Sequence, residues 1–162
     1  RNNGGGNLTT AEKLAERFTN EKKLIGYMSY KTGPGHNEFS TPEAVYLEPP
    51  MDRVRWQKHT VVLTNRRSYS ATNDFVNRMK QLDRVTVIGD KTGGGSGLPF
   101  SSELPNGWSV RFSASPMYDP DMKHLEFGIE PDKKVDITSE DYNKGIDTII
   151  EAAREYLHNH KQ

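Results

Sequence analysis

Apolar and polar positions alternate along this chain in short blocks whose spacing predicts a mixture of strands and helices. Runs rich in apolar and aromatic residues predict strands over 24–30, 60–64 and 84–89. Apolar positions at helical spacing predict helices after a capping box at 9–12, over 73–82 and over 139–158. In the last helix one face is expected to pack into the core: Ile146, Ile149, Ile150, Ala153 and Leu157.

Weaker signals predict further β-structure. Residues 42–55 contain the Pro49-Pro50 break, which is typical of an edge strand or an extended segment. Pro105-Asn106-Gly107 separates 100–104 from 108–113 and predicts a hairpin. Val135 and Ile137 indicate one more short strand. The chain therefore reads as α/β.

Composition narrows the class of protein. The 162 residues fit one domain, taken as 1–162, with 22 basic and 22 acidic side chains, so nothing indicates a nucleic-acid partner. No apolar run approaches the ~20 residues of a transmembrane helix. Cysteine is absent, which excludes disulfides and thiol catalysis. Because the chain opens on Arg1 without a signal segment, we expect it to be part of a longer protein.

The stretch 65–100 carries the strongest chemical signal. It reads as a strand end, a small-residue turn, a helix, a second strand and a glycine loop at 93–97, the order in which α/β enzymes present a nucleophile. The turn places Ser70 where a helix begins, beside unpaired backbone N–H groups that could stabilise an oxyanion. The alternative is that Ser68 or Ser70 simply caps the helix, which is the commoner role of serine at such a position.

Other motifs are weaker or absent. Gly4-Gly5-Gly6 precedes a helix and suits an anion or oxyanion site, although glycine runs are more often flexible linkers. No P-loop occurs, and the five histidines show no metal-binding spacing. No metal or cofactor is therefore expected.

Four segments together resemble the catalytic core of the S41 serine peptidases, the family of C-terminal processing and tricorn-type proteases. They are Arg1–Gly6, Ser68–Ala71, Gly89–Gly95 and Gly128–Asp132. The resemblance implies a ClpP/crotonase-like α/β fold, a spiral of β-β-α units with a mixed sheet and a C-terminal helix. It spans nearly the whole chain.

The resemblance also implies roles for individual residues. Ser70 matches the family's nucleophile, and the amides of Gly5 and Ala71 match its oxyanion hole. Gly94 and Gly95, in the glycine loop, are candidates for lining the substrate cleft, with an ordinary flexible connection as the alternative.

The general base departs from the processing-protease pattern. Gly95 stands where that branch has its catalytic Lys, which makes a Ser–Lys dyad improbable unless Lys91 reaches the site. The sequence instead resembles the tricorn-like branch, in which a His acts as base with a supporting Glu. That His would precede Arg1. Glu126 is the match for the supporting Glu, with Glu130 as second choice and an ordinary surface Glu as the alternative.

The expected function is a serine endopeptidase acting on peptides or unfolded chain ends. One alternative is a non-catalytic ligand- or peptide-binding module on the same scaffold, and another is a crotonase-like acyl-coenzyme-A enzyme. The expected partner is a peptide or protein substrate, and oligomer formation stays open. By resemblance, the location is the bacterial cell envelope or the secreted fraction.

Overall fold

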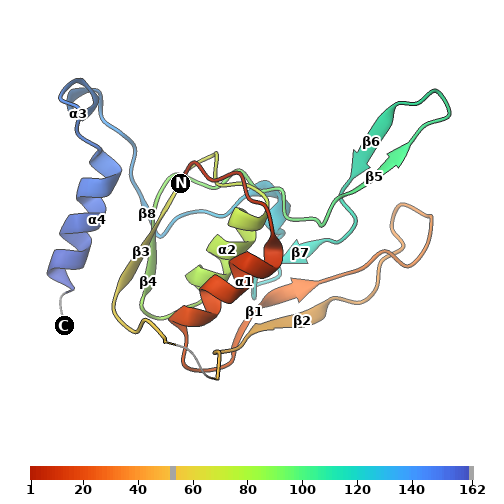
Figure 1. The fold of residues 1–162 in the computed structure, drawn as a ribbon, viewed down its shortest axis with the longest axis horizontal. Helices are drawn as coiled ribbons and strands as arrows, with labels where there is room; N and C mark the ends of the chain where they lie inside the picture. Colours follow the sequence, from red (N-terminus) through yellow and green to blue (C-terminus); the bar gives the residue numbers. More distant parts are fainter. Residues whose placement is uncertain (52–53, 161–162) are drawn as a thin grey trace.

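The computed structural model describes residues 1–51 and 54–160. Figure 1 shows how helices and strands follow one another along the chain. The elements are α1 (Leu8–Ala15), a 3-10 turn (Glu16–Phe18), β1 (Lys23–Met28), β2 (Glu43–Leu47), β3 (Thr60–Thr64), α2 (Ala71–Lys80), β4 (Val85–Gly89), β5 (Phe100–Glu103), β6 (Ser109–Phe112), β7 (Met117–Tyr118), a 3-10 turn (Leu125–Phe127), β8 (Lys133–Lys134), α3 (Ser139–Asn143) and α4 (Thr148–Asn159).

Among the described residues the strands form three separate sheets. β2, β1 and β7 pair antiparallel in that order, and β3, β4 and β8 pair parallel. β5 and β6 form an antiparallel hairpin. Parallel and antiparallel pairs thus do not share one sheet, and the expectation of a mixed sheet is wrong in this respect. The edge strand predicted within 42–55 is confirmed over Glu43–Leu47, because β2 pairs with β1 alone among the described residues. Residues 52 and 53 of that prediction lie outside the described residues.

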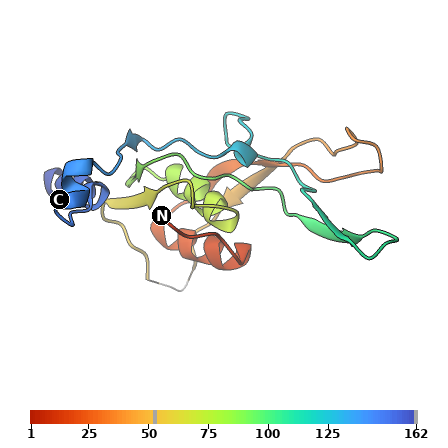
Figure 2. The same cartoon turned by 90° about the horizontal axis from the view of Figure 1, so that it is seen from above.

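Helix α2 lies between the two larger sheets and supplies much of the core. Met79 and Leu82 pack with buried residues of α1, β1 and β2. Val76 packs with Val87 of β4 and with Met117. Neighbouring residues of a strand point to opposite faces, so Ile88 faces the other way and packs against α4. β4 is therefore covered by α2 on one face and by α4 on the other (Figures 1 and 2).

The C-terminal helix differs from its prediction. One helix was expected over 139–158, but the chain forms α3 and α4 with a turn at Gly145, whose φ is +70°. Asp147 then caps α4 by accepting hydrogen bonds from the amides of Ile149 and Ile150. Ile146 falls in the break and is 41% exposed, so it does not join the core face, and Leu157 is also exposed.

The first helix also begins differently from its prediction. Asn7, not Thr9, occupies the N-cap of α1, and its side chain accepts from the amide of Thr10. The helix therefore starts at Leu8, directly after the glycine run. This shorter connection brings Gly5 and Gly6 to the end of α2 that carries Ser70, as the contacts below establish.

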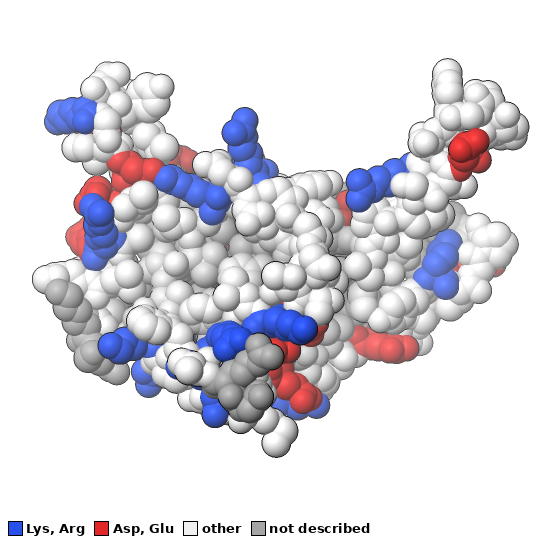
Figure 3. Space-filling model, viewed as in Figure 1, with Lys and Arg blue, Asp and Glu red and all other residues white. Residues whose placement is uncertain are grey.

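The surface has no single-sign field on the face seen in Figure 3. Lys and Arg are interspersed with Asp and Glu around the rim, while the centre is largely uncharged. The β5–β6 hairpin projects from the body of the molecule (Figure 1). No helix in the described part of the chain is both long and apolar enough to span a bilayer.

Candidate active site

Ser70 occupies a strained backbone position at the start of α2. Its φ of +59° and ψ of −128° lie outside the regions that residues with a side chain normally adopt. Ser70 stands at the N-cap, yet its side chain makes no capping hydrogen bond. Neither does Ser68 cap α2, since its hydroxyl accepts from the amide of Asn65. The interpretation of these serines as caps is wrong, and the Ser70 hydroxyl is left for another use.

The N-terminal segment is held against this turn. The amide of Tyr69 donates to the carbonyl of Asn3 at 3.1 Å. The side chains of Asn2 and Asn65, 63 residues apart, are joined by a hydrogen bond of 2.7 Å. These bonds place the glycine run beside Ser70.

Gly5 approaches the turn so closely that no side chain fits there. Its φ is +93°, and a Cβ atom would lie 2.6 Å from the Tyr69 carbonyl oxygen and 2.8 Å from the Ala71 nitrogen. Only glycine accepts both the angle and the contact. The predicted oxyanion residues Gly5 and Ala71 are therefore brought together beside Ser70.

The two amides differ in their partners. The Gly5 amide donates to Oδ1 of Asn3 at 3.0 Å. The Ala71 amide is the first of α2, and no hydrogen bond is found for it among the described residues. An incoming oxyanion would thus meet one open donor and one that must exchange the Asn3 side chain for the ligand. No sequence pattern indicates this contact.

The glycine loop supports the turn from the other side. The amide of Ser70 donates to the Gly94 carbonyl at 2.8 Å, and the amide of Gly95 donates to the Glu126 carbonyl at 3.1 Å. A Cβ on Gly95, whose φ is +81°, would lie 2.3 Å from the ring of Tyr69. Gly94 and Gly95 were predicted to line the substrate cleft. The Gly94 carbonyl and the Gly95 amide instead form hydrogen bonds within the fold. Gly95 also lines the cavity beside Ser70, and Gly94 does not.

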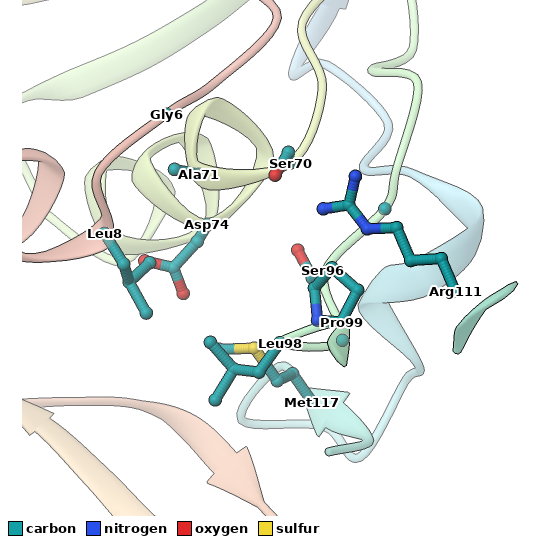
Figure 4. A pocket seen from close by; sticks show the side chains of 12 residues that line it. Gly6, Leu8, Ser70, Ala71, Asp74, Ser96, Leu98, Pro99, Arg111 and Met117 are labelled. Carbon is teal, nitrogen blue, oxygen red and sulfur yellow. The ribbon is translucent and has the colours of Figure 1, made fainter. Parts of the chain in front are cut away.

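That cavity, here called the Ser70 cavity, has a volume of about 260 Å³. Figure 4 shows Ser70 and Ala71 at one side, Asp74 with Leu8, and Arg111 reaching in from the side opposite Asp74. Its lining is Gly6, Leu8, Ser70, Ala71, Asp74, Gly95, Ser96, Gly97, Leu98, Pro99, Arg111 and Met117. A strained serine, backbone donors and a side-chain-sized space thus meet at one place.

The two candidate glutamates lie in different surroundings. Glu126 is half-buried, and its Oε2 atom is fully buried with no hydrogen-bond partner among the described residues. This oxygen lies beside Gly97 and would be 3.1 Å from a Cβ there. Glu130 is exposed and pairs with Lys91 at 3.1 Å. Neither side chain lines the Ser70 cavity, but Glu126 borders it through Gly97.

No described histidine or lysine lines the Ser70 cavity. Lys91 lines a different hollow with His124, on the side of Glu130. Three histidines gather at a second pocket of about 540 Å³, here called the His-rich pocket. It is lined by Trp56, Lys58, His59, Arg84, Arg154, Leu157, His158 and His160. Within the described ranges no cluster of His, Asp and Glu could hold a metal ion.

Three polar residues of the site were missed by the sequence analysis. Asn73 is fully buried and donates to Ser96 Oγ at 2.7 Å and to the Leu125 carbonyl at 3.0 Å, which ties α2 to the glycine loop. Asp74 lies four residues after Ser70, a helical spacing that could have placed it on the same face. Arg111 comes from β6, and no local signal connects it with Ser70.

Comparisons with known proteins bear on the family and the fold of the chain. A candidate peptidase from Parabacteroides merdae, seen in a crystal structure, is 62% identical with a TM-score of 0.92, over 97% of this chain and 50% of that one. Mature CPAF shares the fold at 16% identity, with a TM-score of 0.81, over 99% of this chain and 43% of that one.

A protein of Staphylococcus saprophyticus, named as a probable CtpA-like serine protease, is 26% identical over 137 residues, which are 84% of this chain and 26% of that protein. This chain thus spans at most half the length of these relatives. The sequence profile of peptidase family S41 matches residues 1–135. The chain belongs to peptidase family S41.

Proposed function

We propose that this chain is the catalytic core of a serine endopeptidase that hydrolyses peptide bonds through an acyl-enzyme on Ser70. Membership of family S41 supports peptide-bond hydrolysis. The same proposal includes the ClpP/crotonase-like spiral of β-β-α units as the parent architecture. A peptide or protein is the substrate, and the bacterial cell envelope or the secreted fraction is the location.

One observation carries the proposal: Ser70 holds a positive φ while its hydroxyl caps nothing. A strained conformation of this kind costs on the order of 1–3 kcal/mol and persists only where the surroundings enforce it. Here the Asn3–Tyr69 and Gly94–Ser70 hydrogen bonds enforce it from two sides. The strain lifts the side chain off the helix end and toward the Ser70 cavity, as a nucleophile requires.

In the proposed reaction Ser70 Oγ attacks the scissile carbonyl carbon and its proton passes to a base. The carbonyl oxygen becomes an oxyanion, which the amides of Ala71 and Gly5 stabilise, the latter after Asn3 Oδ1 withdraws. The base then gives its proton to the leaving amine. Water hydrolyses the acyl-enzyme by the same steps and restores Ser70.

We assign the general base to a histidine upstream of Arg1, with Glu126 as its supporting carboxylate. Support comes from the buried, unpartnered Oε2 of Glu126, because a buried carboxylate oxygen without a hydrogen bond is costly. A donor supplied from outside the chain would remove that cost. Glu130 serves less well, since it is exposed and already paired with Lys91.

The test is peptide hydrolysis by the longer protein that includes the upstream segment. Ser70→Ala removes one hydroxyl and should lower turnover by about 10⁴-fold or more, since loss of a nucleophilic serine abolishes the covalent route. The melting temperature should not fall. Ser102→Ala, in exposed β5, is the matched control and should keep full activity. Full turnover by Ser70→Ala would refute the mechanism.

A non-catalytic peptide-binding module is the second candidate. The contact between the Gly5 amide and Asn3 Oδ1 favours it, because a closed oxyanion hole does not serve catalysis. Under this alternative, peptides bind both the wild-type protein and Ser70→Ala and are released intact. A crotonase-like acyl-coenzyme-A enzyme would likewise need no covalent intermediate on Ser70.

A further inference from the structure

Asp74 is a buried carboxylate in the wall of the Ser70 cavity. It lies one helical turn beyond Ser70 and is 2% exposed. Its Oδ2 atom accepts from Nε of Arg78 at 2.6 Å. Its Oδ1 atom is also buried, but has no hydrogen-bond partner among the described residues. Figure 4 shows the carboxylate directed from α2 toward Leu8, on the side of the cavity away from Arg111.

The charges around Asp74 do not balance. Arg78 is 3% exposed, and besides Asp74 it contacts Glu12 Oε1 at 3.3 Å. One guanidinium therefore serves two carboxylates, which leaves one negative charge in excess. Burial raises the pKa of Asp74, and Glu12 adds to the rise while Arg78 opposes it. A cation placed at Oδ1 would supply both the missing charge and the missing hydrogen bond.

The remaining walls of the cavity suit the stem of a long side chain. Leu8, Leu98 and Met117 contribute apolar surface to the wall of the cavity. Lysine and arginine combine an aliphatic stem with a terminal cation, and such side chains bury the stem along apolar surface. A volume of about 260 Å³ is enough for one side chain of this size.

Arg111 also lines the cavity and bears the opposite charge. Its side chain is exposed, so water can satisfy it, whereas the Oδ1 atom of Asp74 is out of reach of solvent. Satisfying a buried unpaired oxygen gains more than pairing a hydrated cation. Asp74 rather than Arg111 therefore decides which side chain the cavity prefers.

We propose that Asp74 makes this site selective for a basic residue, Lys or Arg, immediately before the bond that is cleaved. The inference rests on the proposed peptidase function and deepens it by naming the substrate class. The selected side chain enters the Ser70 cavity, lays its stem along Leu98 and Met117, and donates a hydrogen bond from its terminal nitrogen to Asp74 Oδ1, which a small rotation of the Asp74 side chain uncovers. Asp74 acts as a specificity residue and takes no part in the bond-breaking steps.

The test uses peptidyl diphenyl phosphonates that differ only in their last side chain: lysine, norleucine or glutamate. Ser70 Oγ attacks phosphorus, phenoxide leaves, and the adduct is located by intact mass and peptide mapping. In the longer protein the lysine probe should label Ser70 at least 10-fold faster than the norleucine probe. In Asp74→Asn that ratio should fall to about 3-fold or less. Asp121→Asn, the same change at an exposed site, should keep the wild-type ratio.

A small fluorophosphonate without a peptide side chain separates the possible failures. If it labels Ser70 but the wild-type protein prefers norleucine or glutamate, the specificity inference is wrong and the peptidase function stands. Preference for glutamate would assign the selection to Arg111. If Asp74→Asn does not fold, the wild-type ratio alone decides the question. If no probe labels Ser70, the proposed function fails and this inference falls with it.

Discussion

The Ser70 cavity and the His-rich pocket divide the features of a hydrolytic site between them. The His-rich pocket is larger, about 540 Å³ against about 260 Å³, and is lined by three histidines together with Lys58, Arg84 and Arg154. No described histidine lines the Ser70 cavity, but it has a strained serine, two converging backbone segments and a buried carboxylate. The His-rich pocket is thus rich in titratable side chains, whereas the Ser70 cavity is distinguished by its backbone geometry.

The strained backbone at Ser70 therefore identifies the candidate active site better than pocket size or histidine content does. At the His-rich pocket two lining residues have partners outside the lining: His160 stacks on Tyr156, and Arg84 donates to the Gln57 backbone carbonyl. Around Ser70, by contrast, three polar groups have no hydrogen-bond partner among the described residues: the Ala71 amide, Asp74 Oδ1 and Glu126 Oε2. Unsatisfied polar groups beside a strained serine are what a bound peptide and a base would complete.

Among variants that keep Ser70, the largest effect is expected at Gly5. In Gly5→Ala the new Cβ would lie 2.6 Å from the Tyr69 carbonyl oxygen, so the segment must move away from Ser70. Loss of one oxyanion donor costs about 10²- to 10³-fold in rate, and peptide hydrolysis by the longer protein should fall by that factor. Gly4→Ala meets no atom within 4 Å and is the matched control.

The same assay tests whether the His-rich pocket takes part in hydrolysis. His59→Ala removes a ring from the His-rich pocket and should leave hydrolysis unchanged. If His59→Ala lowers the rate as strongly as Gly5→Ala, the His-rich pocket takes part in the chemistry and the separation of the two regions is wrong.

The next effect concerns the support beneath the Ser70 cavity. Asn73→Ala removes hydrogen bonds to Thr92, Ser96 and the Leu125 carbonyl, all of them buried. Leaving buried polar groups without partners should lower the free energy of unfolding by about 3 kcal/mol, measured by urea denaturation. Asn143→Ala, at an exposed position of α3, should change it by less than about 0.5 kcal/mol. A loss below that level in Asn73→Ala would show that the network does not hold the site.

The smallest effect concerns α4, which carries part of the His-rich pocket. Asp147 caps α4 and pairs with Arg1, and the hydrogen bond from Arg1 lowers the pKa of Asp147 although burial opposes this. Asp147→Ala should cost about 1 kcal/mol of stability, while Asp147→Asn keeps the cap and should cost less. Labelling of Ser70 should be unaffected by either variant.

The pH dependence of Asp147 has a definite sign. Its pKa is lower in the folded than in the unfolded chain, so the stabilisation is present above the unfolded value and is lost as the pH falls through the folded value. The stability difference between wild type and Asp147→Asn should therefore shrink on acidification. A difference that grows at acid pH would contradict the assigned pairing.

Local patterns predicted most of the fold. β3 was expected at 60–64 and is found there, α2 is shifted by two residues at each end, and β4 begins one residue later than predicted and ends as predicted. The hairpin around Asn106 is confirmed as well. The break between α3 and α4 was missed because Ile146 continues the apolar spacing past Gly145, and the spacing outweighed the glycine signal. Sheet membership was also missed, since it depends on contacts between distant segments.

The site was predictable where its residues lie in the segments that resemble the peptidase family. Gly5, Ser70 and Ala71 do lie together, as their order in the resembling segments implied. Arg111 was not found, because its place at the cavity depends on how the distant strand β6 lies relative to α2. Asp74 was missed although it lies one helical turn after Ser70. The Asn3 contact with Gly5 is a matter of one side-chain rotamer, and no sequence pattern encodes that. The roles of Ser70, Glu126 and the glycines remain predictions.

The most direct test of the central claim is labelling with a fluorophosphonate probe, followed by intact mass and peptide mapping. It is applied to this chain and to the longer protein that includes the upstream segment. The account predicts a single adduct on Ser70 in the longer protein and none, or far slower labelling, in the chain alone. Equal labelling of both would place the base within these residues, and no labelling of either would contradict the assignment of Ser70 as nucleophile.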